Sequence, residues 1–205
     1  MAKNTNPNLT TDNYRKHTPK NPLQKYLIDR FFATFLQTIK FTNINSVLDV
    51  GCGEGFTMQR MKDAGIGKTR EGVEYSKDAI AIAKKLYPDL NIKQGDIYNL
   101  PYKANSFELL VCTEVLEHLE YPKKALLELV RVSKKYVLLS VPNEPWFMLA
   151  NLLRGKNLSR WGNDIEHIQH WTSGSFEKFT KVKGVKVADK KLSFPWTIIL
   201  LKKTV

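Results

Sequence analysis

The chain has 205 residues, 42% hydrophobic and 25% charged, which is enough for one substantial core and too few for two ordinary domains. This composition excludes a disordered chain, and no apolar run reaches the roughly 18 residues that a membrane span needs. The net charge of +12 indicates attraction to anions such as nucleic acid, acidic lipid headgroups or a phosphorylated substrate, although lysine-rich solvated surfaces are also common.

The N-terminal region divides into a polar arm and a helix. Residues 1–21 are polar, and residues 1–11 lack the apolar stretch of a secretory signal, so we expect a frayed tail in a cytosolic protein. Residues 22–40 carry apolar side chains at helical spacing, which predicts an amphipathic helix before the main domain.

The central region, residues 46–143, alternates short β-branched runs with helical patterns. This alternation is typical of an α/β protein in which helices cover both faces of a mostly parallel sheet. The expected strands are residues 46–51, 69–75, 91–95, 107–113 and 135–141, and the expected helices follow the first strand to about residue 64 and cover 77–86 and 122–132.

The last third departs from strict alternation. Residues 144–172 form an insertion, helical as far as residue 161, and residues 173–205 supply a closing helix (173–181) and two strands (185–189 and 194–202) that pair antiparallel. We therefore expect a single domain over residues 1–205.

A glycine-rich turn follows the first expected strand, in the run Asp49-Val-Gly51-Cys52-Gly53-Glu-Gly55. Glycines allow positive φ and a close approach of ligand to backbone. Dinucleotide enzymes use a related turn, GxGxxG, but here the spacing is GxGxG and an acid stands two residues before the first glycine. This turn favours a zwitterionic sulfonium cofactor over a pyrophosphate, and a dehydrogenase stays open as the alternative.

Two further acids stand at the ends of the next two strands. Glu74 can accept both hydroxyls of a ribose, and Asp96 can accept an adenine amino group while Ile97 packs on the ring. Each acid alone is a common turn residue. Acids at three successive strand ends indicate an adenosine-containing cofactor.

The run from Val47 to Asn143 resembles class I S-adenosylmethionine-dependent methyltransferases, including ubiquinone-biosynthesis O-methyltransferases. The resemblance implies a Rossmann-like sheet of seven strands in the order 3-2-1-4-5-7-6, with the last strand antiparallel. It also implies a set of cofactor-binding residues: Asp49, Gly51, Cys52, Gly53, Gly55, Glu74, Tyr75, Asp96, Ile97, Cys112 and Thr113. We expect both cysteines to be buried free thiols.

The segment after the fourth strand carries the candidate catalytic groups Glu114 and His118 and the candidate metal ligand Glu117. In a helix they would share one face, where they can bind a divalent metal or support His118 as a base. The spacing resembles the ExxEH metal site of small-RNA 3′-terminal 2′-O-methyltransferases, which implies a later histidine, either His167 or His170. We favour His170 and expect it to join the catalytic and metal ligands; a metal-free site is the alternative.

Two segments outside the shared core are expected to shape the acceptor pocket: the basic arm Tyr14–Arg30 and the apolar residues 145–156. The second predicts a lid or an interfacial helix, or alternatively a core helix. The leading function is O-methylation of a small-molecule or lipid-linked acceptor by a cytoplasmic protein that contacts the membrane peripherally. The alternatives are an RNA 2′-O-methyltransferase and a non-catalytic cofactor-binding protein, and nitrogen acceptors stay open.

Overall fold

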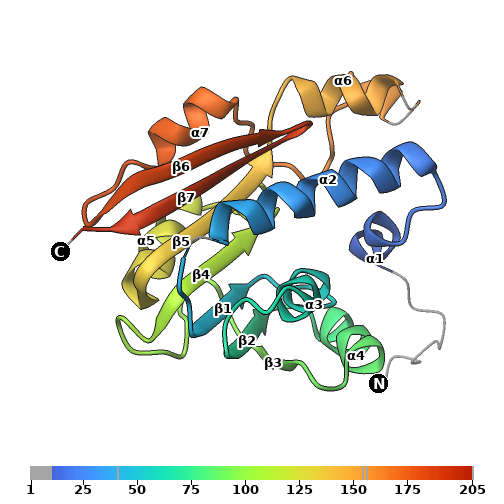
Figure 1. The fold of residues 1–205 in the computed structure, drawn as a ribbon. Coiled ribbons are helices and arrows are strands. Elements are labelled where there is room, and N and C mark those ends of the chain that lie inside the picture. Colours follow the sequence, from blue (N-terminus) through green and yellow to red (C-terminus); the bar gives the residue numbers. More distant parts are fainter. Residues whose placement is uncertain (1–10, 41, 154, 156, 205) are drawn as a thin grey trace, which may run out of the picture.

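The computed structural model describes residues 11–40, 42–153, 155 and 157–204. Within these residues, seven strands form one sheet in the order β3-β2-β1-β4-β5-β7-β6 (Figure 1). The first five strands run parallel, and β7 pairs antiparallel with both β5 and β6. The strands are β1 (Ser46–Val50), β2 (Thr69–Glu74), β3 (Asn91–Gln94), β4 (Phe107–Thr113), β5 (Ser133–Pro142), β6 (Val185–Ser193) and β7 (Trp196–Lys203). The predicted fold class and strand order are confirmed.

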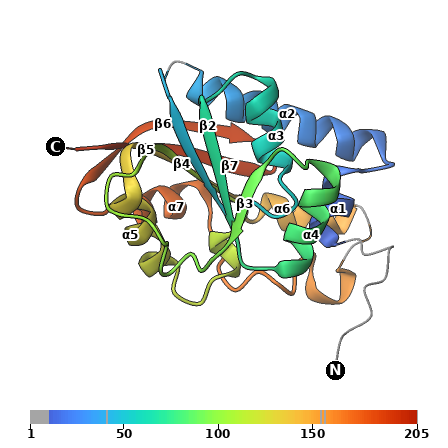
Figure 2. The same cartoon turned by 90° about the horizontal axis from the view of Figure 1, so that it is seen from below.

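Helices cover both faces of this sheet (Figures 1 and 2). Helices α2, α3 and α4 pack on one face, whereas α5 and α7 pack on the other. The helical elements are α1 (Asp12–His17), α2 (Pro22–Ile39), α3 (Phe56–Asp63), α4 (Lys77–Leu86), the 3-10 turn η1 (Leu116–His118), α5 (Pro122–Val132), α6 (Trp146–Leu153), the 3-10 turn η2 (Leu158–Arg160) and α7 (Ser173–Thr180).

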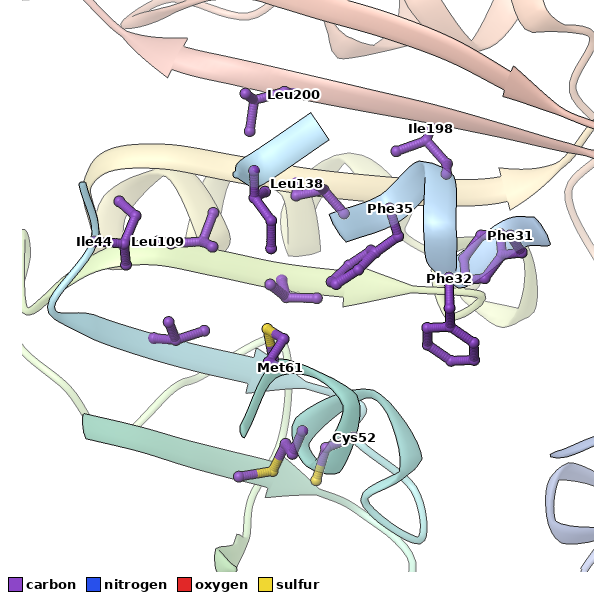
Figure 3. Packing of buried hydrophobic residues seen from close by; sticks show 14 of the residues in the cluster. Phe31, Phe32, Phe35, Ile44, Cys52, Met61, Leu109, Leu138, Ile198 and Leu200 are labelled. Atoms are coloured by element: carbon purple, nitrogen blue, oxygen red, sulfur yellow. The ribbon is translucent and has the colours of Figure 1, made fainter. Parts of the chain in front are cut away.

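Helix α2 crosses the sheet on an aromatic face. Asn21 caps its first turn by accepting from two backbone amides, and Pro22 fits the first helical position because its missing N–H needs no partner there. Phe31, Phe32 and Phe35 are buried against the sheet, with Leu138 and the residues around it (Figure 3). This packing fixes one end of α2 over the carboxyl ends of the parallel strands.

Most element boundaries agree with the predicted ones to within two residues, and the exceptions lie in the arm and in the last third. The arm contains helix α1, where only a polar tail was expected, and the expectation for residues 1–10 lies outside the described residues. Helix α6 ends at Leu153, well before residue 161, and β6 continues to Ser193. No helix among the described residues is long and apolar enough to cross a membrane.

Candidate active site

A cavity of about 1300 Å3 lies at the carboxyl ends of β1, β2, β3 and β4. In the order β3-β2-β1-β4, the chain reverses its direction of travel across the sheet between β1 and β4, and such a switch point is where open α/β sheets bind ligands. The loops after these strands line the cavity together with residues of α1, α2 and α6. The fold therefore joins the predicted cofactor loops to the arm and the insertion.

The glycine-rich turn after β1 requires glycine at its first position. Gly51 has a φ of +73°, and a Cβ atom there would lie 2.4 Å from a methyl group of Val115. The Gly51 amide donates to the carbonyl of Val73 at 2.8 Å, so the turn is tied to the end of β2. Gly51, Cys52 and Gly53, which belong to the predicted cofactor-binding set, line the cavity.

Glu74, at the end of β2, organises this turn. One carboxylate oxygen accepts from the amide of Gly53 at 2.9 Å, and the other accepts from the amide of Ser76 at 2.7 Å. Each carboxylate oxygen has two lone pairs, so both can still accept from the hydroxyls of a ligand. Tyr75 and Asp96 line the same part of the cavity.

The residues after β3 and β4 complete this half of the cavity. Ile97 and Thr113 line it, while one carboxylate oxygen of Asp96 accepts from the amide of Tyr98 at 2.8 Å. The structure thus brings the ends of the first four strands together around one space.

Three residues of the predicted cofactor set do not line the cavity. Gly55 adopts a left-handed conformation that starts α3, and Cys112 is fully buried within β4. Asp49 is buried in β1 behind the glycine turn, where desolvation, and next the negative charge of Glu74, raise its pKa to about 8. A backbone turn and two buried strand positions hold these groups away from the solvent-filled space.

Both cysteines are free and buried, as expected. Burial raises the pKa of the Cys52 and Cys112 thiols, because a thiolate is poorly solvated in the core. Neither thiol therefore has the ionised form that nucleophilic chemistry needs.

The segment after β4 does not form the helix that would place Glu114 beside Glu117. Glu114 has a φ of +58°, and a 3-10 turn begins at Leu116. The Glu114 carboxylate instead accepts from Ser140 Oγ at 3.1 Å, from Lys16 Nζ at 3.2 Å and from Trp196 Nε1 at 2.5 Å. Glu114 lines the cavity as a hydrogen-bonded wall residue, separate from the cluster that contains Glu117.

That cluster consists of Glu117, His118 and His167. One ligand atom from each residue lies within 4.8 Å of the others. Glu117 is 1% exposed, and neither of its carboxylate oxygens has a hydrogen-bond partner among the described residues. Burial, and next the charge of Glu114, raise the pKa of Glu117 well above the usual range. An unpartnered buried carboxyl is costly, so a ligand that satisfies it gains free energy.

Backbone contacts place His167 over His118. The carbonyl of Glu117 accepts from the amides of Ile168 and Gln169, both at 2.9 Å, which ties the loop that carries His167 to η1. The two imidazole rings lie 5.1 Å apart in an edge-to-face arrangement.

His118 is also held in one tautomer. Its Nδ1 lies 2.8 Å from the carbonyl oxygen of Glu166, which can only accept, so Nδ1 carries the hydrogen, and in the neutral ring the lone pair is on Nε2.

The structure places His170 outside this site. His170 is exposed and does not line the cavity, whereas His167 does. The two histidines are three residues apart, and the hydrogen bonds of Ile168 and Gln169 to η1 decide which one enters. The spacing in the sequence carries no signal for that choice.

The arm is docked on the glycine turn, which the sequence did not predict. Thr11 and Asn13 donate to the carboxylate of Glu54, a buried residue of the turn. The His17 ring stacks on Phe56 at 4.6 Å, and burial, assisted by nearby positive charge, lowers the pKa of His17 to about 3. Neutral His17 therefore packs as an aromatic ring at the start of α3.

Apolar side chains of two helices line the cavity. They are Leu27, Ile28 and Phe31 of α2 and Phe147 and Ala150 of α6. An apolar space beside a histidine with a free lone pair can hold a hydrophobic molecule and remove a proton from it.

Comparison with known proteins agrees with this geometry. Residues 48–140 match the family of the methyltransferase domain. Over 88 residues the chain is 34% identical to a demethylmenaquinone methyltransferase of Renibacterium salmoninarum, covering 43% of this chain and 36% of that protein. Over 124 residues it is 29% identical to the mitochondrial ubiquinone biosynthesis O-methyltransferase of Saccharomyces cerevisiae, covering 56% and 38%. The chain thus spans less than half the length of these curated relatives.

A solved structure extends the likeness to nearly the whole fold. The magnesium protoporphyrin IX methyltransferase of Synechocystis PCC 6803, with bound SAH, superposes with a TM-score of 0.68 at 16% identity. The match covers 94% of this chain and 97% of that protein. At this identity the comparison supports the fold alone.

Proposed function

Since residues 48–140 form a methyltransferase domain whose relatives include S-adenosylmethionine-dependent enzymes, we propose that the protein transfers a methyl group from S-adenosylmethionine to a hydroxyl of a small amphiphilic molecule. The observation that carries this proposal is the shared cavity. The ends of β1, β2 and β3 meet the Glu117–His118–His167 cluster across one space.

Residues of the strand ends would hold the methyl donor. Glu74 would accept from the ribose hydroxyls, Asp96 and Ile97 would contact the adenine, and the turn Gly51–Gly53 would let the donor lie against the backbone. The donor carries its own activated methyl group, so the protein mainly orients the two reactants and excludes water. The size of the cavity supports this proposal, because about 1300 Å3 exceeds the ~300–1,000 Å3 of most ligand pockets and leaves room for a second molecule.

Residues of the opposite half would hold the acceptor. The apolar wall from α2 and α6 suits a hydrophobic body, and two of the curated relatives are named for quinone biosynthesis. His118 Nε2 would accept the proton of the acceptor hydroxyl as the bond from its oxygen to the methyl carbon forms; the sulfur–methyl bond of the donor breaks in the same step and leaves S-adenosylhomocysteine. The hydrogen bond from His118 Nδ1 to Glu166 keeps the ring oriented and the lone pair free.

A second part of the proposal is a divalent cation at the histidine cluster; His118 Nε2 would then bind the cation and would not act as the proton acceptor. One carboxylate and two imidazoles are a common donor set for zinc and for iron, and the unpartnered oxygens of Glu117 are groups that a cation would satisfy. A bound cation would polarise an acceptor hydroxyl. His167, and not His170, is the second histidine ligand in this arrangement.

The test is transfer of a radiolabelled methyl group to a panel of acceptors, with and without chelator. Transfer to phenolic amphiphiles, at a rate that chelator lowers and an added divalent cation restores, supports both parts of the proposal. An unchanged rate of transfer in chelator would contradict the cation and would support His118 as a base without a metal. Transfer only to the 3′ end of RNA would favour the alternative function of an RNA 2′-O-methyltransferase. The histidine cluster and the net charge of +12 are the features that support this alternative. Binding of the donor with no transfer to any member would favour a non-catalytic protein.

A further inference from the structure

Helix α6 exposes three of its large apolar residues to solvent and buries a polar one. Asn151 is the buried residue of this helix, all eight of whose residues are described, and it donates to the carbonyl of Gly162 at 2.9 Å. Trp146 and Leu149 are exposed, and Leu153 is 80% exposed. A helix that fills a core would bury its large apolar side chains, so the core-helix alternative does not hold for Trp146–Leu153, the part of the predicted segment that forms α6.

Neighbouring segments add exposed apolar side chains to those of α6. Trp161 is 75% exposed, and Leu158 is exposed beside it in η2. Leu23 and Tyr26 are exposed on the first turns of α2. Residues of α2, α6 and the loop after η2 all line the cavity, and both ribbon views place these elements at the same end of the molecule (Figures 1 and 2). We call Leu23, Tyr26, Trp146, Leu149, Leu153, Leu158 and Trp161 the apolar rim.

Positive charge accompanies the apolar rim. Between Tyr14 and Arg30 the chain carries five basic residues against one acid, Asp29, and Asp29 is already paired with Lys25 and Arg60. The basic residues are Arg15, Lys16, Lys20, Lys25 and Arg30. Lys20 and Lys25 are exposed on either side of the exposed Leu23, so charge and apolar surface are interleaved.

We infer that the apolar rim docks on the surface of a membrane that contains anionic phospholipids. Tryptophan and tyrosine favour the boundary between headgroups and acyl chains, leucines enter it, and lysines and arginines attract anionic headgroups. A protein partner is less favoured, since lysine is depleted in the centres of protein–protein interfaces and Lys20 and Lys25 are exposed beside the rim.

Docking at the rim would bring the mouth of the cavity to the membrane. An amphiphilic acceptor could then pass from the bilayer into the apolar half of the cavity without crossing water, and this consequence rests on the proposed function. The docking itself follows from surface chemistry alone, so each proposal can fail without the other.

The experiment is sedimentation of the full chain with vesicles of phosphatidylcholine and with vesicles that also contain phosphatidylglycerol. Wild-type protein should bind the second kind more tightly, and added salt should weaken that binding. The double variant Leu149→Ser/Leu153→Ser should lower binding about tenfold, because two inserted side chains are lost. The matched control is Leu127→Ser/Leu192→Ser, which removes two exposed leucines of α5 and β6 and should leave binding unchanged.

Each contrary result is distinct. Equal loss in both double variants, or no binding of wild-type protein to either vesicle, overturns the inference. A wild-type dimer in sedimentation velocity that the Leu149→Ser/Leu153→Ser variant dissolves would assign the rim to a second copy instead. Binding of S-adenosylmethionine is measured on the same samples. If the protein binds this donor but no vesicles, only the membrane docking is contradicted. If it binds vesicles but not the donor, only the proposed function is contradicted.

Discussion

The two halves of the cavity are built in different ways. On the side of β1, β2 and β3, the groups come from residues 49–97, in chain order, and backbone amides such as those of Gly53 and Ser76 hold them. On the side of η1, the contacts join segments far apart in the sequence: Lys16 reaches Glu114 across 98 residues, and Trp196 reaches it across 82. The first half therefore follows from local pattern, while the second depends on how distant segments pack.

The largest expected effect separates a histidine that lines the cavity, His118, from one that lies outside it, His170. The substitution His118→Ala should lower kcat by about 10²–10⁴-fold, because the group that takes the proton is lost. The substitution His170→Ala, on an exposed ring outside the cavity, should leave kcat within about twofold of the wild-type value. Rates of labelled methyl transfer, measured at saturating donor, compare the two. A larger loss in the His170 variant would contradict the arrangement of the second half.

The glycine turn tests the first half. The substitution Gly51→Ala adds a methyl group 2.4 Å from Val115 at a positive φ, which should cost about 2–5 kcal/mol of unfolding free energy. Gly65→Ala is the matched control, because Gly65 has a φ of +68° and nothing within 4 Å of its added methyl, so only about 1–2 kcal/mol of backbone strain applies. Urea unfolding measures both. Equal losses would mean that Val115 yields and that the turn is not closely packed.

Asp49 makes the first half sensitive to pH. Its pKa in the folded protein is raised from 3.8 to about 8, mainly by burial. Between these values the folded protein keeps a proton that the unfolded chain has released, so the free energy of unfolding falls as pH rises from about 4 and levels off above about 8. Asp49→Asn removes this loss, which is on the order of a few kcal/mol.

The measurement is urea unfolding of wild type, Asp49→Asn and the exposed control Asp63→Asn, at several pH values across this range. The stability of Asp49→Asn relative to wild type should increase with pH, while the control should run parallel to wild type. Parallel curves for all three proteins would show that the raised pKa of Asp49 does not contribute to stability.

The smallest expected effect concerns the arm. The ion pair between Lys16 and Glu114 is partly exposed, with 30% and 16% of the side chains accessible, so it is worth about 0.2–1 kcal/mol. Lys16→Met keeps the apolar stem and should raise KM for the acceptor about two- to fivefold without changing donor affinity. Lys20→Met, on an exposed lysine of the same arm, is the control. If Lys16→Met weakens donor binding as much as it raises KM for the acceptor, the arm contributes to both halves of the cavity, which contradicts this prediction.

The contrast between the two halves also explains which features of the molecule could be predicted from the sequence. The sequence predicts the strand order and the turn at Gly51, and it places Glu74, Asp96 and Ile97 at strand ends. These features could be predicted because the spacing of apolar residues, the glycines and prolines that end elements, and the glycine-rich motif are all local signals. The choice of His167 over His170 could not, since it depends on two amides that bond to the carbonyl of Glu117 about 50 residues away.

Some local signals were overridden by their surroundings. The run after β4 has helical spacing, yet Glu114 takes a left-handed conformation and bonds to Ser140 and Trp196. The arm is polar and its sequence resembles a frayed tail, yet Thr11 and Asn13 donate hydrogen bonds to the buried carboxylate of Glu54. Both outcomes come from tertiary hydrogen bonds, for which a single sequence carries no pattern.

The most direct test of the account is calorimetric titration of the protein with S-adenosylmethionine and, separately, with NAD. We predict that the protein binds S-adenosylmethionine and not NAD, and that Glu74→Ala weakens this binding by about 1.5–3 kcal/mol, the range for hydrogen bonds to a charged group. The matched control is Glu71→Ala, on the same strand, where the carboxylate contacts Lys93 and Tyr102 outside the cavity and should not affect binding. Binding of NAD, or the same affinity for S-adenosylmethionine in wild type and Glu74→Ala, would contradict the assignment of the cavity.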